Sequence, residues 1–273
     1  MRLYRHERIP QFYSSSIFTQ VCETGECKPV SIILFWDLLG NYLRYALPDG
    51  QLLTKLDHIP FTPEDYKKFE KILADPYSVL ENFAIEELTG SREKARIDEI
   101  DGITGATPKS ISNSIVEGAV YTCYTIWHLA HGSISGHIAT ITDSIATSGW
   151  MLNEFIKSED IDLRYWATKK LLGQPEKYPD EVRNLITSFD STDIFGIKNL
   201  LSELPDDLLH QSWVQEHLWH QYEKYNFSLQ KLLLEKYQRI PVDRHLKRYI
   251  LSLAAKGNHR QQQLFNSLVF KPE

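Results

Sequence analysis

The sequence contains few cysteines, no long apolar run and no concentration of positive charge. It has 273 residues, of which only 3 are cysteine. Three cysteines are too few for the disulfide framework of a small secreted domain. The most apolar stretch, residues 30–40, is interrupted by Asp37 and is well short of the roughly 18 apolar residues that indicate a transmembrane helix. The sequence therefore predicts no membrane span.

Charge and composition exclude further classes. Lysine and arginine together number 30 against 36 acidic residues, for a net charge of -6, and the basic residues are scattered. Nothing builds the basic face that nucleic-acid binding requires, so no nucleic-acid partner is expected. Hydrophobic residues at 42% and charged residues at 24% are ordinary for a globular protein, which argues against wholesale disorder and collagen-like structure. The length fits two domains or one large one.

The sequence features do not decide between a cytoplasmic and an exported protein. Residues 1–10 are polar and contain arginine, unlike a secretory signal, so the protein is either cytoplasmic or exported after removal of a leader. Cys22 and Cys27 flank a glycine-containing turn that a disulfide can close, and two free thiols fit equally well. A zinc clip lacks a second pair of ligands.

The N-terminal half is expected to combine strands and helices. Short β-branched and aromatic runs separated by glycine and by Pro-Asp-Gly predict strands at residues 31–37, 41–47 and 51–56. Thr62 followed by Pro63 predicts the start of a helix, with Thr62 as its N-cap.

Two more helices are expected before residue 132. A second helix is predicted over residues 78–88, followed by a charged loop over residues 91–100 that runs into a short strand. Residues 108–131 carry apolar side chains on nearly all sides, which predicts one long buried helix.

The C-terminal half predicts helices only. Stretches of helical periodicity recur over residues 138–147, 160–172, 180–189, 193–203, 207–222, 228–237, 243–255 and 260–267. Short paired helices are typical of an α-solenoid of the HEAT or armadillo kind, but no signature repeats at a fixed period, so an irregular helical domain is equally open. The predicted fold class is α+β, with a sheet-containing domain over residues 1–132 and an all-α domain over residues 133–273.

One heptapeptide stands out. Residues 101–107 read Asp-Gly-Ile-Thr-Gly-Ala-Thr and are followed by Pro108. Asp101, Thr104, Gly105, Ala106 and Thr107 match all five constrained positions of the pattern Asp-x-x-(Ser/Thr)-Gly-Ala-(Ser/Thr), which average composition produces in roughly one unrelated chain in a thousand.

This heptapeptide resembles the motif of the FMN-binding domain family, whose best-known members are flavin subunits of the sodium-pumping NADH:quinone reductase and of the Rnf complex. In that family a flavin transferase links FMN, through its phosphate, to the last hydroxyl of the motif. The resemblance implies that Thr107 is the acceptor and that Asp101, Thr104, Gly105 and Ala106 are motif residues. It covers about residues 30–131 and implies a small mixed sheet with helices packed on it. It transfers no contact to the isoalloxazine ring, because a Glu-Thr-Pro-Gly stretch of the electron-transfer subunits is missing.

The resemblance also implies a role and a location. The protein is expected to be an electron-transfer module with covalent FMN at Thr107, a redox carrier more than a turnover enzyme. The implied partners are a flavin transferase and a redox protein, either a membrane complex or a cytochrome. Family members are largely exported, which favours a periplasmic location and a Cys22–Cys27 disulfide. The alternative is an interaction scaffold that keeps the motif but carries no flavin.

The residues around Thr107 favour a phosphate ester independently. As the N-cap of a long helix, Thr107 would hold the phosphate at the positive end of the helix dipole, and Lys109 would add a positive charge. Gly105 and Ala106 leave room for close approach. A plain helix start after a glycine turn also accounts for Thr107 and Pro108, but it leaves Asp101 and Thr104 unexplained.

Other candidate residues carry weaker signals. His128 with His131, and His217 with His220, have the i, i+3 spacing that presents two imidazoles on one helix face, but no third metal ligand is visible near either pair. Tyr121, Tyr124 and Trp127 are expected to pack in the core. No catalytic residue and no metal site is predicted, because no nucleophile elbow, Walker loop or Rossmann glycine pattern is present.

Overall fold

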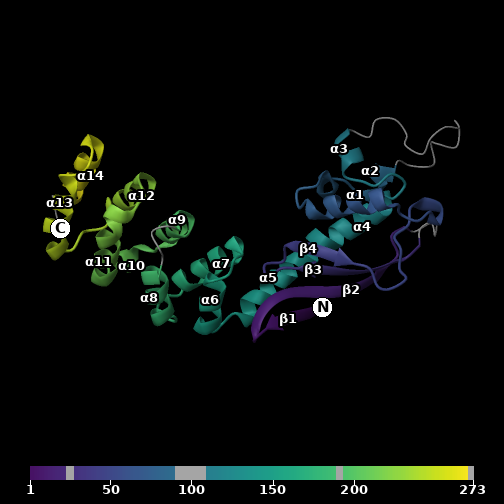
Figure 1. Cartoon of the computed structure of the whole chain (residues 1–273), viewed down its shortest axis with the longest axis horizontal. Helices are drawn as coiled ribbons and strands as arrows, with labels where there is room; N and C mark the ends of the chain where they lie inside the picture. The colour runs from purple at the N-terminus through teal and green to yellow at the C-terminus, as the bar shows by residue number, and fades with distance from the viewer. Residues whose placement is uncertain (23–27, 90–108, 189–192, 270–273) are drawn as a thin grey trace. The chain divides into compact units, whose positions relative to one another are not determined.

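The computed structural model describes residues 1–22, 28–89, 109–188 and 193–269 of the chain. Its residues group into two compact units, unit 1 over Met1–Ala146 and unit 2 over Thr147–Glu273. All described strands lie in unit 1, and the described elements of unit 2 are all helices (Figure 1). The predicted α+β class is therefore confirmed.

Unit 1 contains one four-stranded sheet. The strands are β1 (Arg2–His6), β2 (Ile9–Thr19), β3 (Val30–Trp36) and β4 (Tyr42–Ala46), and they lie in sequence order. Each pair of neighbours is antiparallel. The sheet is thus a meander and not the mixed sheet that the resemblance implies, because each strand joins the next by a short connection and none crosses over to run parallel.

The predicted strands agree with the structure only in part. The strands expected over residues 31–37 and 41–47 are β3 and β4. The one expected over residues 51–56 is wrong, because that stretch makes only a single bridge from Thr54 to Pro60 before a 3₁₀ turn, η1 (Leu56–His58). The β1–β2 hairpin was not predicted. Its turn places Glu7 and Arg8 at φ of 47° and 75°, without the glycine or asparagine that marks such turns.

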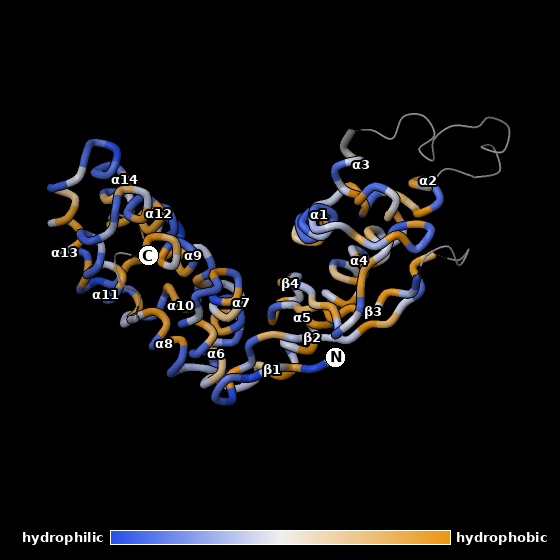
Figure 2. The backbone as a smooth tube through the Cα atoms, turned by 45° about the vertical axis from the view of Figure 1, so that its right-hand side comes forward, coloured by the Kyte–Doolittle hydropathy of each residue, from blue (hydrophilic) through white to orange (hydrophobic). Residues whose placement is uncertain are grey.

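One face of the sheet supports the core of unit 1. Ile32, Leu34 and Trp36 alternate along β3 and are fully buried, and Figure 2 colours most of this strand as apolar. The Trp36 indole donates a 2.7 Å hydrogen bond to the carbonyl of Ala130, and the hydroxyl of Tyr13 lies 3.1 Å from that of Thr142. Helices from residues 120–145 therefore cover this face.

The helix predicted after Thr62 is confirmed. It is α1 (Pro63–Ala74), in which Thr62 accepts from the backbone N–H of Asp65 and the Asp65 carboxylate accepts from that of Thr62. This reciprocal capping box satisfies two N–H groups at the helix start. The helix predicted over residues 78–88 is instead two short pieces, η2 (Val79–Asn82) and α2 (Ile85–Thr89).

The long helix predicted over residues 108–131 is wrong. The chain forms α3 (Lys109–Asn113), leaves helical geometry, and begins again as α4 (Val120–His131). Gly118 interrupts the helix at φ +74°, and its carbonyl accepts a 2.7 Å hydrogen bond from the backbone of Leu56 instead of from a following turn. Apolar periodicity continues across the break because Ile115 and Val116 are still buried.

Helix α5 (Ser133–Ile145) belongs to unit 1. Its Ser135 hydroxyl donates a 2.6 Å hydrogen bond to the carbonyl of Gly40, which ends the β3–β4 turn at φ +89°. The division after Ala146 therefore differs from the one expected after Gly132, because α5 packs back on the elements before it.

Unit 2 is a stack of short helices. They are α6 (Gly149–Ile156), α7 (Ile161–Leu172), α8 (Pro179–Ser188), α9 (Ile194–Glu203), α10 (Asp206–Leu209), α11 (Ser212–Gln221), η3 (Tyr222–Lys224), α12 (Phe227–Tyr237), α13 (Arg244–Ala254) and α14 (His259–Val269). Helix α7 contacts α9, α9 contacts α12 and α12 contacts α14, while α6 contacts α8. The contacts thus run between neighbouring pairs of helices, as in stacked helical arrays.

Candidate functional site

The predicted FMN acceptor motif lies outside the described residues. Asp101, Thr104, Gly105, Ala106 and Thr107 all belong to residues 90–108, which the structure does not describe. Lys109 is the first residue of α3. The structure therefore describes the elements that lead into and out of the motif, and not the motif itself.

The elements on both sides of the motif are attached to the helices of unit 1. Helix α2, which precedes it, contacts α4. After it, α3 contacts η2, and the Lys68 ammonium of α1 donates a 2.9 Å hydrogen bond to the carbonyl of Ser112. Residues 90–108 therefore connect two points on one layer of helices.

Helix α3 is too short to supply the expected electrostatics. It has five residues, whereas the sequence predicted a helix running to His131. A helix dipole grows with the number of aligned peptide units, so the described five residues of α3 have a smaller dipole than the long helix that was predicted. The match of the five motif residues does not depend on the length of this helix.

The segment that follows α3 is fixed by buried contacts. Ile111 and Val116 are buried, and the backbone N–H of Val116 donates to the Sγ atom of Cys123 at 3.2 Å. Cys123 is fully buried, and this burial raises the pKa of its thiol to about 12. The thiol therefore stays protonated at neutral pH and serves in packing, not as a nucleophile.

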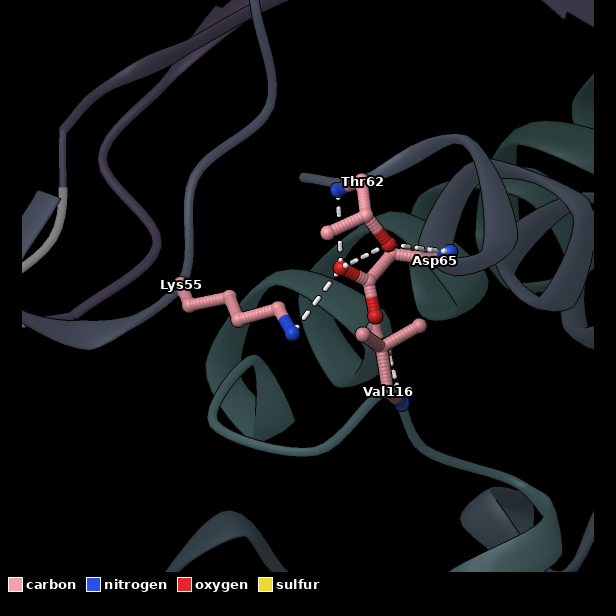
Figure 3. Close-up of polar contacts among 5 residues, drawn as sticks. Lys55, Thr62, Asp65 and Val116 are labelled. Atoms are coloured by element: carbon pink, nitrogen blue, oxygen red, sulfur yellow. Dashed lines mark hydrogen bonds and ion pairs between the residues drawn. The ribbon is translucent and has the colours of Figure 1, made fainter. Parts of the chain in front are cut away.

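A polar cluster ties the loop before α1 to that helix (Figure 3). The Lys55 ammonium lies 2.9 Å from the Asp65 carboxylate, which also accepts 2.8 Å and 2.9 Å hydrogen bonds from the backbone and hydroxyl of Thr62. Burial acts to raise the pKa of Asp65, but the hydrogen bonds from Lys55 and Thr62 outweigh it and hold the pKa below its usual range. Every group of this cluster is paired, so its role is structural.

Both histidines of α4 form hydrogen bonds to backbone carbonyls. The Nε2 atom of His131 lies 2.8 Å from the carbonyl of Leu73, and that of His128 lies 3.1 Å from the carbonyl of Leu80. Because a carbonyl only accepts, both Nε2 atoms carry hydrogen. Burial lowers the pKa of His131, which favours this neutral donor.

The second histidine pair is engaged in the same way. The Nδ1 atom of His220 bonds to the carbonyl of Glu216 on its own helix at 2.7 Å. His217 bonds to the backbone of Ile186, and its pKa is lowered by burial first and by His220 second. Among the residues that the structure describes, no three metal-ligating side chains come together.

The aromatic residues of α4 divide into core and edge. Trp127 is 3% exposed and donates a 2.8 Å hydrogen bond to the carbonyl of Asp75, so the packing role predicted for it is confirmed. Tyr121 and Tyr124 are half-buried, and the Tyr124 ring lies 4.2 Å from that of His128.

Cys22 follows β2, is buried and is disulfide-bonded. Cys27, with which the resemblance pairs it, lies outside the described residues.

A cavity in unit 2 was not predicted. It measures about 470 Å³ and lies between α6, α7, α8 and α9; we call it the unit 2 pocket. Its polar lining includes Asn153, Arg164, Asn184, Asp193 and Asn199. These residues come from separate helices and form no motif in the sequence, so only folding brings them together.

Comparisons with known proteins give no match. No family model, no curated protein and no solved structure is similar to the chain. In the described part of the chain, no helix combines the length and the apolar character needed to cross a bilayer.

Proposed function

We propose that this protein is an electron-transfer flavoprotein that carries FMN as a phosphate ester on the Oγ1 atom of Thr107. The observation that supports the proposal is the heptapeptide Asp101–Thr107, which matches all five constrained positions of the flavin acceptor motif. A helix start alone requires neither Asp101 nor Thr104, so it does not account for the match.

The chain has a limited part in the chemistry. FMN, when attached, supplies one- and two-electron transfer. Thr107 gives its hydroxyl oxygen to the new bond with phosphorus, the bond between that phosphorus and the leaving group of the flavin donor breaks on the transferase, and the leaving group takes up the hydroxyl proton. Gly105 and Ala106 keep the approach free of side-chain bulk. The ester retains the cofactor where free FMN would be lost by dissociation. The protein is therefore proposed as a carrier and not as a turnover enzyme.

The proposed partners and location follow from the same chemistry. A flavin transferase attaches the cofactor, and a membrane complex or cytochrome exchanges electrons with it, with unit 2 as the docking module. The disulfide at Cys22 supports a periplasmic or otherwise exported location, because disulfides persist in oxidising compartments.

The test is the intact mass of the denatured protein after co-expression with a flavin transferase. Wild type is expected to gain the mass of FMN less one water. Thr107→Ala is expected to gain nothing, and Thr107→Ser is expected to keep the gain because it keeps a hydroxyl. Thr140→Ala is the matched control, since Thr140 lies on α5 and its hydroxyl only bonds to the carbonyl of Gly136.

Two results contradict the proposal. One is no mass gain in wild type while the same transferase modifies a known acceptor. The other is a gain that persists in Thr107→Ala, which would move the ester to another residue.

A second candidate function is an interaction scaffold without flavin. The observation that favours it is the unit 2 pocket, which lies in a unit that does not contain the motif. The mass measurement separates the two candidates, because a scaffold stays unmodified and colourless.

A further inference from the structure

The unit 2 pocket has the size and lining of a binding site. Its volume of about 470 Å³ falls in the range of about 300–1,000 Å³ that is usual for ligand sites. Ile156 and Leu185 contribute apolar surface, and the buried Thr168 contributes a hydroxyl. The other polar groups belong to one arginine, one lysine, one aspartate, three asparagines, one serine and one tyrosine.

Arg164 is the least satisfied of these groups. Its Nη1 atom lies 3.6 Å from the Asp193 carboxylate, which is beyond hydrogen-bond distance. Its Nε atom is buried and has no hydrogen-bond partner within the described chain, although the side chain as a whole is 30% exposed. A charged donor without a partner is costly, so the guanidinium would be stabilised by a ligand that brings it an acceptor.

Asp193 does not satisfy that edge, because it has another task. Its Oδ1 atom accepts a 2.9 Å hydrogen bond from the backbone of Gly196 and so caps the start of α9. Turning the carboxylate fully toward Arg164 would break this cap. The guanidinium of Arg164, which is part of the pocket lining, is therefore available to a carboxylate through its remaining N–H groups.

Three carboxamides share the pocket lining with Arg164. Asn153 comes from α6, Asn184 from α8 and Asn199 from α9. Within the part of the chain that the structure describes, none of the three side chains has a hydrogen-bond partner. Each carboxamide carries both a donor and an acceptor, which is the pair that a peptide group presents in complement.

The charges of the lining select the ligand. Lys157 is paired with Glu154 at 2.7 Å, whereas Arg164 has only the longer 3.6 Å ion pair with Asp193, so Arg164 is the less satisfied cation of the lining. Asp193, so close to Arg164, would repel a second negative charge. A singly charged carboxylate fits better than a phosphate dianion.

We propose that the unit 2 pocket binds an acidic side chain of an extended peptide segment from a partner protein. Arg164 binds the carboxylate through its guanidinium, and the three asparagines bind the peptide groups on either side. This proposal does not depend on FMN, because none of its residues lies in the motif or in unit 1.

The test is a binding titration of the whole chain with fluorescent pentapeptides that differ only at the central residue. A central glutamate is expected to bind about 10- to 100-fold more tightly than a central glutamine, the range for one charged hydrogen-bonded pair. N-acetylglutamate methylamide and a phosphoserine pentapeptide complete the set.

Three variants locate the binding. Arg164→Gln is expected to remove the preference for glutamate, and Arg164→Lys is expected to lose most of it while keeping a cation near Asp193. Arg239→Gln is the matched control, because Arg239 is exposed and lies outside the pocket. Circular dichroism confirms that each variant is folded.

Each contrary result overturns a stated part of the proposal. Equal binding of the glutamate and glutamine peptides, an unchanged preference in folded Arg164→Gln, or no saturable binding at millimolar peptide excludes carboxylate recognition by Arg164. Tighter binding of phosphoserine excludes the selection against dianions. Equal affinity for N-acetylglutamate methylamide points to a small-molecule ligand and excludes the peptide.

Discussion

Several buried nitrogen donors are paired in unit 1 and unpaired in unit 2. In unit 1, the indoles of Trp36 and Trp127 donate to backbone carbonyls at 2.7 Å and 2.8 Å. In unit 2, the buried indole of Trp219 and the Nε atom of Arg164 have no partner in the described chain. Polar groups that are paired internally stabilise a fold, whereas an unpaired polar group in a cavity lining can still form a hydrogen bond to a ligand.

The comparison also separates Arg164 from Trp219. Trp219 is fully buried among Tyr222, Tyr237 and Phe265 and lines no described cavity, so its free N–H is a packing cost. Unit 1 has one such group as well, the hydroxyl of Tyr42, whose pKa is raised by burial. Among these unpaired groups of the described chain, only that of Arg164 belongs to a residue of a pocket lining, and it alone supports a binding proposal.

The largest expected effect contrasts one glycine from each unit. A methyl group at Gly40 would overlap the backbone carbonyl of Ser135, and its φ of +89° disfavours any side chain, so Gly40→Ala is expected to destabilise unit 1 by about 2–5 kcal/mol. At Gly149 the methyl would meet only the movable carboxylate of Glu181. Gly149→Ala is expected to be neutral or slightly stabilising, since alanine favours a helix. Hydrogen exchange measures the stability of unit 1 in Gly40→Ala and of unit 2 in Gly149→Ala. Equal losses of stability in the two variants would contradict the expected difference.

A pair of tryptophans tests the hydrogen bonds directly. Trp36→Phe and Trp219→Phe remove similar ring volume from fully buried sites, but only the first leaves an acceptor, the carbonyl of Ala130, without its donor. Trp36→Phe is therefore expected to cost about 1–3 kcal/mol more than Trp219→Phe. Urea unfolding with hydrogen exchange resolved by unit measures the difference. A larger loss at Trp219 would mean that its indole has a partner in solution.

The smallest expected effect is the pH dependence of the Lys55–Asp65 pair. The pKa of Asp65 is lowered from its ordinary value of 3.8 in the folded state. Its stabilisation of unit 1 is therefore full above that value and is lost as the pH falls through the lower folded pKa. Asp65→Asn is expected to flatten the acid limb of unit 1 unfolding and to leave unit 2 unchanged. An identical acid limb in wild type and variant would show that the pair contributes nothing.

Local signals in the sequence predict some elements and miss others for physical reasons. Thr62 and Pro63 predict the start of α1 because capping depends on neighbouring residues alone. Gly118 gives only an ambiguous signal, since glycine is tolerated within helices, and its left-handed φ depends on a hydrogen bond from distant Leu56. The unit 2 pocket gives no signal, because its lining assembles across four helices. The acceptor motif remains a prediction from sequence.

Three side chains of α4 have a consequence for how freely the motif segment can vary. Trp127, His128 and His131 bond to carbonyls 52, 48 and 58 residues earlier in the chain. These bonds close long loops that contain residues 90–108, and the entropy of closing a loop rises by only about 0.6 kcal/mol for each doubling of its length. Insertions in that segment would therefore cost the core of unit 1 little.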